Sequence, residues 1–198
     1  MIELHRLTRR ALLPALAAAL ALAGCAGKEH VRYGDAKSVE TVTNQFGSTD
    51  LQMIAESMTR SMLQSNAVAS NNLPIVTVQE VKNKTSEYID TRAITDSIRA
   101  ELQKSGKIRF AVDAAAMQQQ VEELQRQQSE LYDKEQAAEM GKMVGAQFRM
   151  EGNIVSIVKQ AKDIKDVYYK FNLQLWNIRN GLLEWSDEKE IRKTSSKG

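Results

Sequence analysis

The sequence predicts an α/β fold, in which a small mixed sheet ending in antiparallel hairpins is flanked by helices. Apolar residues recur at helical spacing in 51–62 and 90–104, and an apolar, β-branched run occupies 73–81 between them. In the last third of the chain, alternate residues of 167–175 are apolar, as in a strand with one buried face. Helices that alternate with strands ahead of a final hairpin favour a sheet covered by helices.

Residues 1–24 have the layout of a secretory signal peptide. An arginine-containing start precedes the apolar run 11–22, and the small residues Ala23 and Gly24 stand before Cys25. In a helix, the apolar run would span roughly 18 Å, which is short of a hydrocarbon core of ~30 Å. We therefore expect the run to be a cleaved leader and not a membrane span.

The stretch LAGC (22–25) resembles the lipobox of bacterial lipoproteins. The resemblance implies cleavage after Gly24, transfer of a diacylglycerol to the Cys25 sulfur and acylation of the new amino group. A single acyl chain binds membranes only reversibly, whereas this set should hold the protein in place for its working life. Ala26 stands where many inner-membrane lipoproteins have aspartate, which implies the periplasmic side of the outer membrane. Residues 25–47 are then the lipidated anchor and a short tether.

One globular domain is expected over 48–191, followed by a loose polar tail over 192–198. In its first half, Ser48-Thr49-Asp50 offer cap residues for a helix, and Gly106 is placed to end a second helix. The expected elements of this half are a helix over 51–62, a strand over 73–81 broken by 83–86, a helix over 90–104 and a strand over 108–112.

The second half is expected to continue with helices and to end in antiparallel strands. A helix over 114–132 lies on the domain in our interpretation, although its Gln-rich segment also fits a coiled-coil partner site. Asp133 precedes a further helix that closes at Gly145, and Asn180-Gly181 is the strongest two-residue hairpin signal. The expected strands cover 146–158, 167–177 and 182–191.

The residue inventory excludes most catalytic sites from the expected domain. Residues 25–198 carry equal numbers of acidic and basic side chains, so charge gives no support for nucleic-acid binding. The two histidines are His5 and His30, and the lone cysteine is Cys25. Histidine-dependent nucleophiles and Cys/His zinc sites are therefore excluded from 48–191, and no phosphate-cradle or GxSxG motif occurs. We expect no cofactor, no metal site and no enzymatic activity.

Three polar or aromatic features leave alternatives open. Carboxylates near the β turns would suit a glycosidase-type reaction, but their flanking lysines are typical of solvated turns. Trp176 and Trp185 would be stacking platforms for a glycan or peptide or, as we favour, packing residues. The lysines of 159–170 would meet an acidic partner or anionic headgroups, although their alternation with acidic residues favours a solvated loop. The carboxylates are those of Asp163, Asp166, Asp187 and Glu188.

Four stretches resemble the LpoB family, outer-membrane lipoproteins that activate a bifunctional class A penicillin-binding protein. They occur in register behind the lipobox, and the resemblance covers most of 73–186. It implies a fold similar to the N-terminal domain of TolB. The stretches are "VQEVKNKT" (78–85), "LQKSGKIRF" (102–110), "VGAQFRMEGNI" (144–154) and "LQLWNIRNGLLEWS" (173–186).

The resemblance implies a non-enzymatic activator. In the family, the domain crosses the periplasm on its tether, passes the peptidoglycan and docks on a small accessory domain of the synthase. A protein that catalyses nothing can act only by binding the active conformation of the synthase better than the resting one. The docking face of the family includes the start of the helix before "VGA" and the strand after it. By alignment this gives the candidates Lys134, Gln136, Arg149 and Glu151.

The chain departs from the family in its tether and in two docking positions. Enteric members have a long, Pro-rich tether, whereas the part after the leader has one proline, Pro74, and 25–47 falls short of a periplasm of ordinary width. A basic position of the family falls on Gln136, and an aromatic one falls on Glu151. The alternative is a lipoprotein component of an envelope assembly, curli-secretion-like or Tol-associated. Such a component should form a large ring, whereas the activator should be a monomer.

Overall fold

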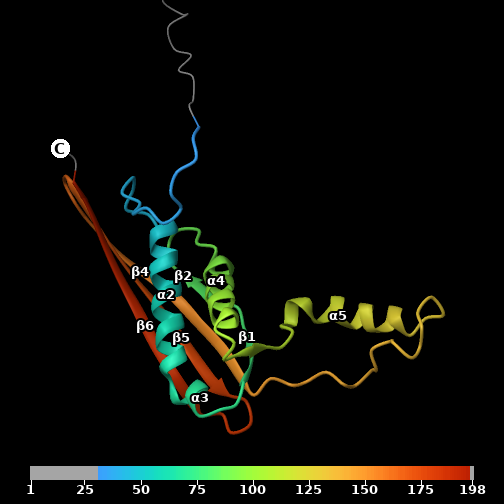
Figure 1. Cartoon of the computed structure of the whole chain (residues 1–198). Coiled ribbons are helices and arrows are strands. Elements are labelled where there is room, and N and C mark those ends of the chain that lie inside the picture. The colour runs from blue at the N-terminus through green and yellow to red at the C-terminus, as the bar shows by residue number, and fades with distance from the viewer. Residues whose placement is uncertain (1–30, 197–198) are drawn as a thin grey trace, which may run out of the picture. The chain divides into compact units, whose positions relative to one another are not determined.

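Helices and strands build one mixed sheet in the computed structural model, which describes residues 31–196 (Figure 1). The predicted α/β class is therefore confirmed, whereas the similarity to TolB stays a prediction. The signal peptide and Cys25 lie outside the described residues. The helices are α2 (Ser48–Gln64), α3 (Asn66–Ala69), α4 (Thr91–Lys104) and α5 (Ala114–Gln127), and the strands are β1 (Ile75–Val78), β2 (Lys82–Lys84), β3 (Arg109–Phe110), β4 (Phe148–Ala161), β5 (Ile164–Asn177) and β6 (Leu183–Ser196).

The sheet has the order β3-β1-β4-β5-β6, and β2 pairs with β4 beyond the end of β1. Strands β1 and β2 run parallel to β4, as β3 does to β1, whereas β4, β5 and β6 form antiparallel hairpins. The β4–β5 ladder is unbroken from Phe148↔Asn177 to Ala161↔Ile164. The short parallel strands come first in the chain and are joined through longer crossovers, as parallel pairing requires. The long antiparallel strands come last and are joined through tight turns.

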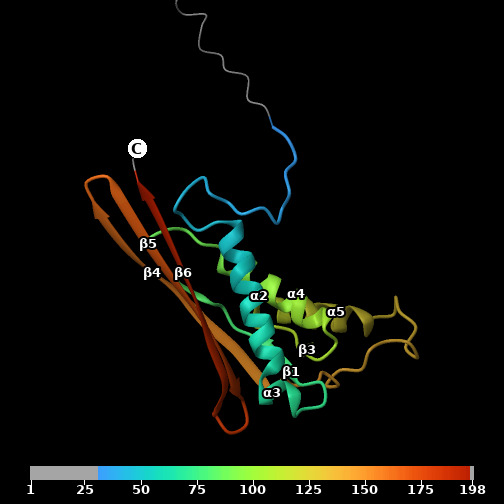
Figure 2. The same ribbon diagram turned by 60° about the vertical axis from the view of Figure 1, so that its left-hand side comes forward.

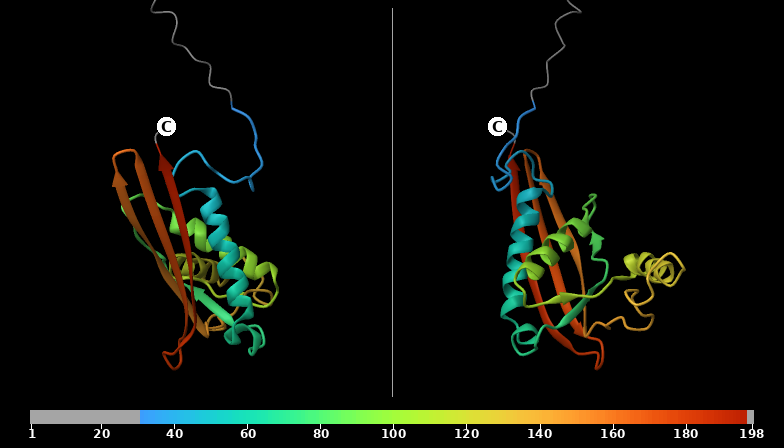
Figure 3. Two further views of the ribbon diagram at one scale, coloured as in Figure 1. Left: turned by 90° about the vertical axis from the view of Figure 1, so that its left-hand side faces the viewer. Right: turned by 45° about the vertical axis from the view of Figure 1, so that its right-hand side comes forward.

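The core lies between one face of the sheet and the helices α2 and α4, which cover that face (Figure 3). Helical spacing puts Ile54, Met58 and Met62 of α2 on this side, where all three are fully buried. Met58 and Met62 therefore fill the core, whereas Met53 on the same helix is exposed. The opposite face of the sheet carries no helix within 31–196. Helix α4 and the sheet contribute Ile94, Ile98, Leu102, Met150, Ile154, Phe171 and Leu173 to the core.

Residues 36–47 belong to the domain, so the tether is shorter than expected. Phe46 packs against the core with its ring edge-on to Tyr169 at 5.8 Å, and the Gln52 side chain donates to the Ala36 carbonyl at 2.7 Å. Glu40 accepts a hydrogen bond from the Ser48 amide at 3.0 Å, which satisfies a donor at the start of α2. The part of the expected tether that precedes the domain is then 25–35.

The expected loose tail is strand through residue 196. Residues 192–196 continue β6, and Lys193 reaches under the start of α2, where its Nζ lies 2.9 Å from Asp50 Oδ2. Asp50 was expected among the cap residues, but the cap position is Gly47, whose amide donates to the same Asp50 oxygen at 2.9 Å. The two side chains are 4% and 16% exposed, so this buried ion pair fixes the tail.

Residues 128–147 contain no helix, although one was expected between Asp133 and Gly145. Asp133 closes only a single turn, in which its carbonyl accepts from the Gln136 and Ala137 amides. The apolar side chains of the expected stripe, Met140 and Val144 among them, are exposed. A short helix gains most of its stability by burying such a stripe, and this segment has no surface on which to do so. Helix α5 also ends early, at Gln127, with Leu124 as its one buried residue.

Two strand boundaries also differ from expectation. The segment expected to break the first strand forms β2, because Lys82–Lys84 pair with Asn153–Val155 of β4. The strand expected over 108–112 is only Arg109–Phe110, at the sheet edge. Helix α4 and the positive φ of Gly106 after it agree with the prediction. No helix within 31–196 is long and apolar enough to cross a membrane.

Candidate functional site

Arg149 and Glu151, which the sequence singles out, lie together on the open face of the sheet. Strand alternation turns Phe148 and Met150 into the core and leaves Arg149 and Glu151 on the opposite face. Arg149 Nε lies 3.2 Å from Glu151 Oε2, and the two side chains are 39% and 35% exposed. Half-exposed, paired charges of this kind are available to a partner that can replace the pairing.

Trp176 stands opposite Arg149 across the β4–β5 ladder and completes this surface. Its indole Nε1 is buried and has no hydrogen-bond partner among the described residues. Next to it in register is Leu183 of β6, and Ile178 donates its amide to the Gln147 carbonyl beside the start of β4. Both aliphatic side chains are exposed. We call Arg149, Glu151, Trp176, Ile178 and Leu183 the distal patch.

The turn that follows Trp176 explains why apolar side chains are exposed there. Asn177 and Leu182 close the turn through a backbone hydrogen bond of 2.8 Å, and Gly181 takes the positive φ of 71° that the turn requires. The hairpin expected at Asn180-Gly181 is therefore confirmed, but its turn covers residues 178–181 and is longer than the two-residue turn that the signal indicates. Sequence reasoning missed the apolar residues of the patch, although "NIRNGLL" places them on both sides of the turn.

Lys134 and Gln136 are not joined to the distal patch. Both lie in the loop between α5 and β4, where the Gln136 side chain donates to Asp133. No hydrogen bond or ion pair links either residue to Arg149 or Glu151 in the described part of the chain. The expected docking face is therefore split between a strand and a loop.

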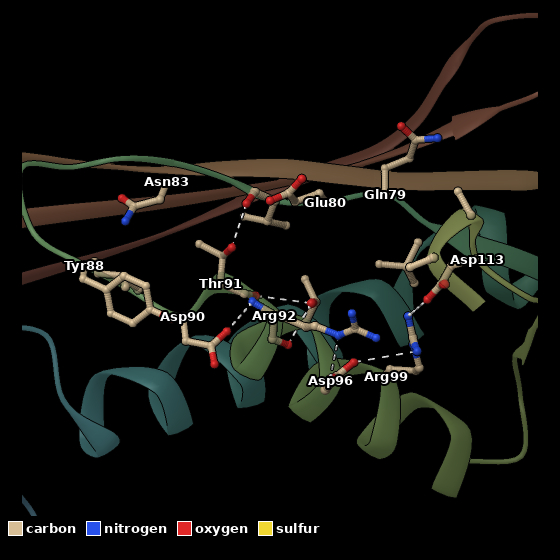
Figure 4. Close-up of a pocket in the computed structure, with 16 residues that line it drawn as sticks. Gln79, Glu80, Asn83, Tyr88, Asp90, Thr91, Arg92, Asp96, Arg99 and Asp113 are labelled. Carbon is tan, nitrogen blue, oxygen red and sulfur yellow. Dashed lines mark hydrogen bonds and ion pairs between the residues drawn. The ribbon is translucent and has the colours of Figure 1, made fainter. Parts of the chain in front are cut away.

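A cleft lies on the helical side, between the chain after β1 and the starts of α4 and α5 (Figure 4). It measures about 770 Å³, and its lining includes the aliphatic side chains of Val78, Val81 and Ile89. Its polar wall is a network of ion pairs in which Arg99 meets Asp113 at 3.2 Å and Asp96 at 3.7 Å (Figure 4).

This network has a structural role at the start of α5. The Ala116 amide, more than the Arg99 guanidinium, holds the pKa of Asp113 below its ordinary value, against the opposing effect of burial. Asp113 therefore stays ionised as the cap of α5 and as the anchor of Arg99. Arg99 also lies over the Phe110 ring, 5.8 Å from its centroid. Arg92, Asp96, Arg99 and Asp113 are therefore paired with one another within the domain.

The remaining sequence candidates are dispersed. Asp166 accepts a hydrogen bond from Thr194 at 2.8 Å and lies 3.7 Å from Arg192, whereas Glu188 pairs with Lys170. Asp187 and Glu188 are neighbours on one strand and face opposite sides of the sheet. These carboxylates therefore do not form the acid–base pair of a glycosidase-type site.

The two tryptophans have different environments. Trp185 packs against the core, and its Nε1 donates to Ser61 Oγ at 3.1 Å, so the packing interpretation is confirmed for this residue. Trp176 lies instead in the open-face patch. A surface platform and a packing residue thus lie on adjacent strands of one hairpin.

Comparison with known proteins identifies the family. The model of the peptidoglycan-synthase activator LpoB matches residues 50–191. The LpoB C-terminal domain from Salmonella enterica is 17% identical (72% of this chain, 98% of that chain, TM-score 0.44), and that from Escherichia coli is 16% identical (72% and 98%, TM-score 0.46). The PelC dodecamer from Paraburkholderia phytofirmans is 17% identical (64% and 75%, TM-score 0.33).

No curated protein matches the sequence. The family model nevertheless covers most of the domain, from the first turn of α2 to β6. Its members are activators of peptidoglycan synthesis and not an enzyme family. The chain belongs to the LpoB family of peptidoglycan-synthase activators.

Proposed function

We propose that the protein is a lipoprotein, anchored through Cys25 to the periplasmic side of the outer membrane, that binds and stimulates a bifunctional class A penicillin-binding protein. The distal patch is the contact surface, and Lys134 and Gln136 in the neighbouring loop add to it. The protein acts without catalysis, by favouring the active conformation of the synthase. Membership of the activator family supports the regulatory role.

The exposed surface around Trp176 carries the assignment of the contact. Trp and Arg dominate the binding energy of protein interfaces, usually at the centre of an apolar area with a polar rim. The distal patch has this composition, since Trp176 and Arg149 stand side by side between exposed Ile178 and Leu183. Glu151 pairs with Arg149 and keeps its orientation defined before a partner arrives.

The position of the patch suits a partner that lies away from the outer membrane. The docked segment 36–47 meets the other end of the long hairpin, where the Asn44 side chain donates to Ser195 Oγ at 3.0 Å. Along β4, ten steps from Lys159 to Arg149 span about 34 Å. The remaining tether, 25–35, would reach about 37 Å if fully extended. The domain itself thus contributes about as much reach as the tether.

The test is the stimulation of glycan polymerisation by a purified class A penicillin-binding protein acting on its lipid-linked precursor. The chain after the leader, with Cys25→Ser to prevent acylation, should increase the rate. Trp176→Ala should raise the concentration needed for half-maximal stimulation by roughly 30-fold, as expected for a central interface residue.

Lys170→Ala is the matched control, because Lys170 lies on the same sheet face, is also 39% exposed and also forms an ion pair, with Glu188. It should change the half-maximal concentration by less than about twofold. If the starting chain stimulates no such synthase, the proposed function is wrong. If both variants stimulate equally well, the function stands but the contact lies elsewhere.

Size distinguishes the activator from a subunit of an envelope assembly. The activator should sediment as a monomer in detergent, whereas an assembly subunit should form a large ring. A ring that fails to stimulate synthesis would favour the assembly role.

A further inference from the structure

The β4–β5 hairpin ends in an exposed tip, residues 157–165, that extends past the first turn of α2 (Figure 2). Beyond the helices, side chains on both faces of the hairpin lose their cover. Ile157 and Ile164 on one face and Val158 on the other are 55%, 52% and 46% exposed. The tip therefore presents aliphatic side chains to the surroundings whichever face is considered.

The lysines of the tip are free to meet an external anion. Lys159, Lys162 and Lys165 form no ion pair among the described residues, and Asp163 is the one unpaired acidic residue between them. Asp166, the next acidic residue, is occupied by Thr194 and Arg192. The tip therefore carries a net positive charge of about two that the domain does not neutralise.

The tip lies at the end of the domain where the N-terminal segment arrives. Ser195 pairs with Lys165 in the β5–β6 ladder, and the same Ser195 accepts the hydrogen bond from Asn44. Figure 2 shows segment 36–47 and the β4–β5 turn at the same end of the domain. Residues 25–35 can span at most about 37 Å, so an anchor at Cys25 keeps this end of the domain within that distance of the membrane.

We propose that the hairpin tip is a membrane-contact site for anionic phospholipid. The lysines contact lipid phosphates while Ile157, Val158 and Ile164 enter the headgroup region, as in other amphipathic interfacial elements. The proposal rests on the lipid anchor of the proposed function, because a tip without an anchor would seldom meet a membrane. With the tip on the membrane, the distal patch points into the periplasm about 34 Å from the surface.

A solvated loop, which the sequence pattern favours, accounts for the lysines alone. It does not account for the three aliphatic side chains that stand among them without cover from the domain. A solvated loop also gives no reason for the tip to lie at the end of the domain that the tether joins. An acidic protein would match the charge, but the short tether brings a lipid surface to this end first.

The test uses the chain after the leader with Cys25→Ser, so that no acyl chain contributes to binding. It should co-sediment with phosphatidylglycerol vesicles at low salt and not with phosphatidylcholine vesicles. Replacing Lys159, Lys162 and Lys165 together by Glu should weaken binding to the anionic vesicles by roughly tenfold or more. The control is the same replacement at Lys104, Lys107 and Lys142, exposed lysines far from the tip along the chain.

Insertion is measured separately with Ile164→Trp. Its fluorescence should shift to shorter wavelength when anionic vesicles are added, whereas Trp176 and Trp185, which lie outside the tip, should contribute a constant background. No shift would mean that the tip does not enter the headgroup region. Ile164 is half-exposed and the lysines of the tip form no ion pair within the domain, so neither Ile164→Trp nor the triple lysine replacement should alter the thermal unfolding midpoint. An unchanged midpoint shows that each variant is folded.

Several outcomes would overturn the proposal. The first is a lack of binding to anionic vesicles, and the second is equal weakening by the tip and control replacements, which would show a general charge effect. The third is a tip variant that binds vesicles normally but loses stimulation of the synthase in solution, which would make the tip a protein contact. Stimulation of the synthase by the starting chain is measured without vesicles. Failure of the proposed function is therefore distinguished from failure of the membrane contact.

Discussion

The two ends of the β4–β5 hairpin are built from the same strands but present different chemistry. At the distal patch, Arg149 is paired with Glu151 and lies between aromatic and aliphatic side chains. At the tip, the lysines are unpaired, and the aliphatic residues include Ile157, which stands opposite Tyr168 in the ladder. A paired charge beside Trp suits a specific protein interface, whereas unpaired lysines around aliphatic side chains suit a lipid surface. One continuous ladder therefore separates two recognition tasks.

The two ends meet at Gly152, where one short parallel strand replaces another along β4. Strand β1 pairs with β4 up to Met150, and β2 takes over at Asn153. A Cβ at position 152 would lie 2.2 Å from the Asn172 carbonyl oxygen, which is backbone and cannot rotate away. The close approach of the strands at this point requires glycine.

The largest effect is therefore expected from Gly152→Ala, which should break the hairpin as a single rigid unit. The clash should lower the free energy of unfolding by about 3 kcal/mol or more, measured by urea denaturation. Gly145→Ala is the control, because nothing lies within 4 Å of its position and its φ is not positive. If both variants were equally stable, the strands would not be held as closely as described.

The next effect concerns the tethered end, which is fixed by the Asp50–Lys193 pair. Asp50→Ala leaves Lys193 largely buried without its partner and should cost about 3 kcal/mol of unfolding free energy. Glu56→Ala, in the exposed pair with Arg60, should cost less than about 0.5 kcal/mol. Both are read from urea denaturation.

A paired replacement sharpens this prediction. Asp50→Asn combined with Lys193→Met removes both charges and should recover most of the lost stability, since the penalty comes from the charge left alone. If the double variant were as unstable as Asp50→Ala, the side-chain packing and not the ion pair would hold the tail.

The comparison of the two ends is tested most directly by charge reversal at each end. Arg149→Glu places a second carboxylate beside Glu151 and should raise the half-maximal concentration for synthase stimulation by roughly 30-fold, equivalent to about 2 kcal/mol. It should leave binding to anionic vesicles within about twofold of the starting chain. The triple tip variant should give the opposite result in both assays. If either variant reduced both activities equally, the two ends would not act separately.

Much of this architecture is predictable because its signals are local. The apolar stripes of α2 and α4 and the apolar alternation of β5 follow from residue spacing. The Asn180-Gly181 pair indicates the position of the turn. Arg149 and Glu151 share a face for the same reason. The expected helix near Met140 failed because its stripe has nothing to pack against, which spacing cannot reveal.

The remaining features depend on contacts between distant parts of the chain. Lys193 is largely buried because its ammonium group pairs with the buried carboxylate of Asp50, which lies 143 positions earlier at the start of α2. Trp176 joins Arg149 through the strand register, and the lysines of the tip are free because Asp166 is taken by Arg192 and Thr194. No local pattern indicates which charge is already paired, so the sequence leaves open whether the lysines of 159–170 meet a partner, anionic headgroups or solvent.

The smallest of the predicted effects is pH-dependent and belongs to the tethered end. Tyr169 is almost fully buried, its hydroxyl donates to the Glu87 carboxylate, and the hydroxyl oxygen lies 3.3 Å from the Asn44 carbonyl oxygen. Burial, and then the hydrogen bond to Glu87, raises the pKa of Tyr169 above its ordinary value. A tyrosine whose pKa is raised in the folded state stabilises the fold fully below its unfolded pKa of about 10, and this contribution is lost as pH rises above that value.

Tyr169→Phe should therefore cost about 1 kcal/mol of unfolding free energy at neutral pH and make stability fall less steeply above pH ~10. Tyr132→Phe is the control, because Tyr132 lies in the loop after α5, is exposed, and forms no hydrogen bond with segment 36–47 among the described residues. Urea unfolding at neutral pH measures the loss of unfolding free energy, and urea unfolding at alkaline pH measures how steeply stability falls as pH rises. An unchanged alkaline slope in Tyr169→Phe would mean that the Asn44 end of the segment is held by Phe46 and Lys193 alone, and the tethered end would then depend on packing and one ion pair.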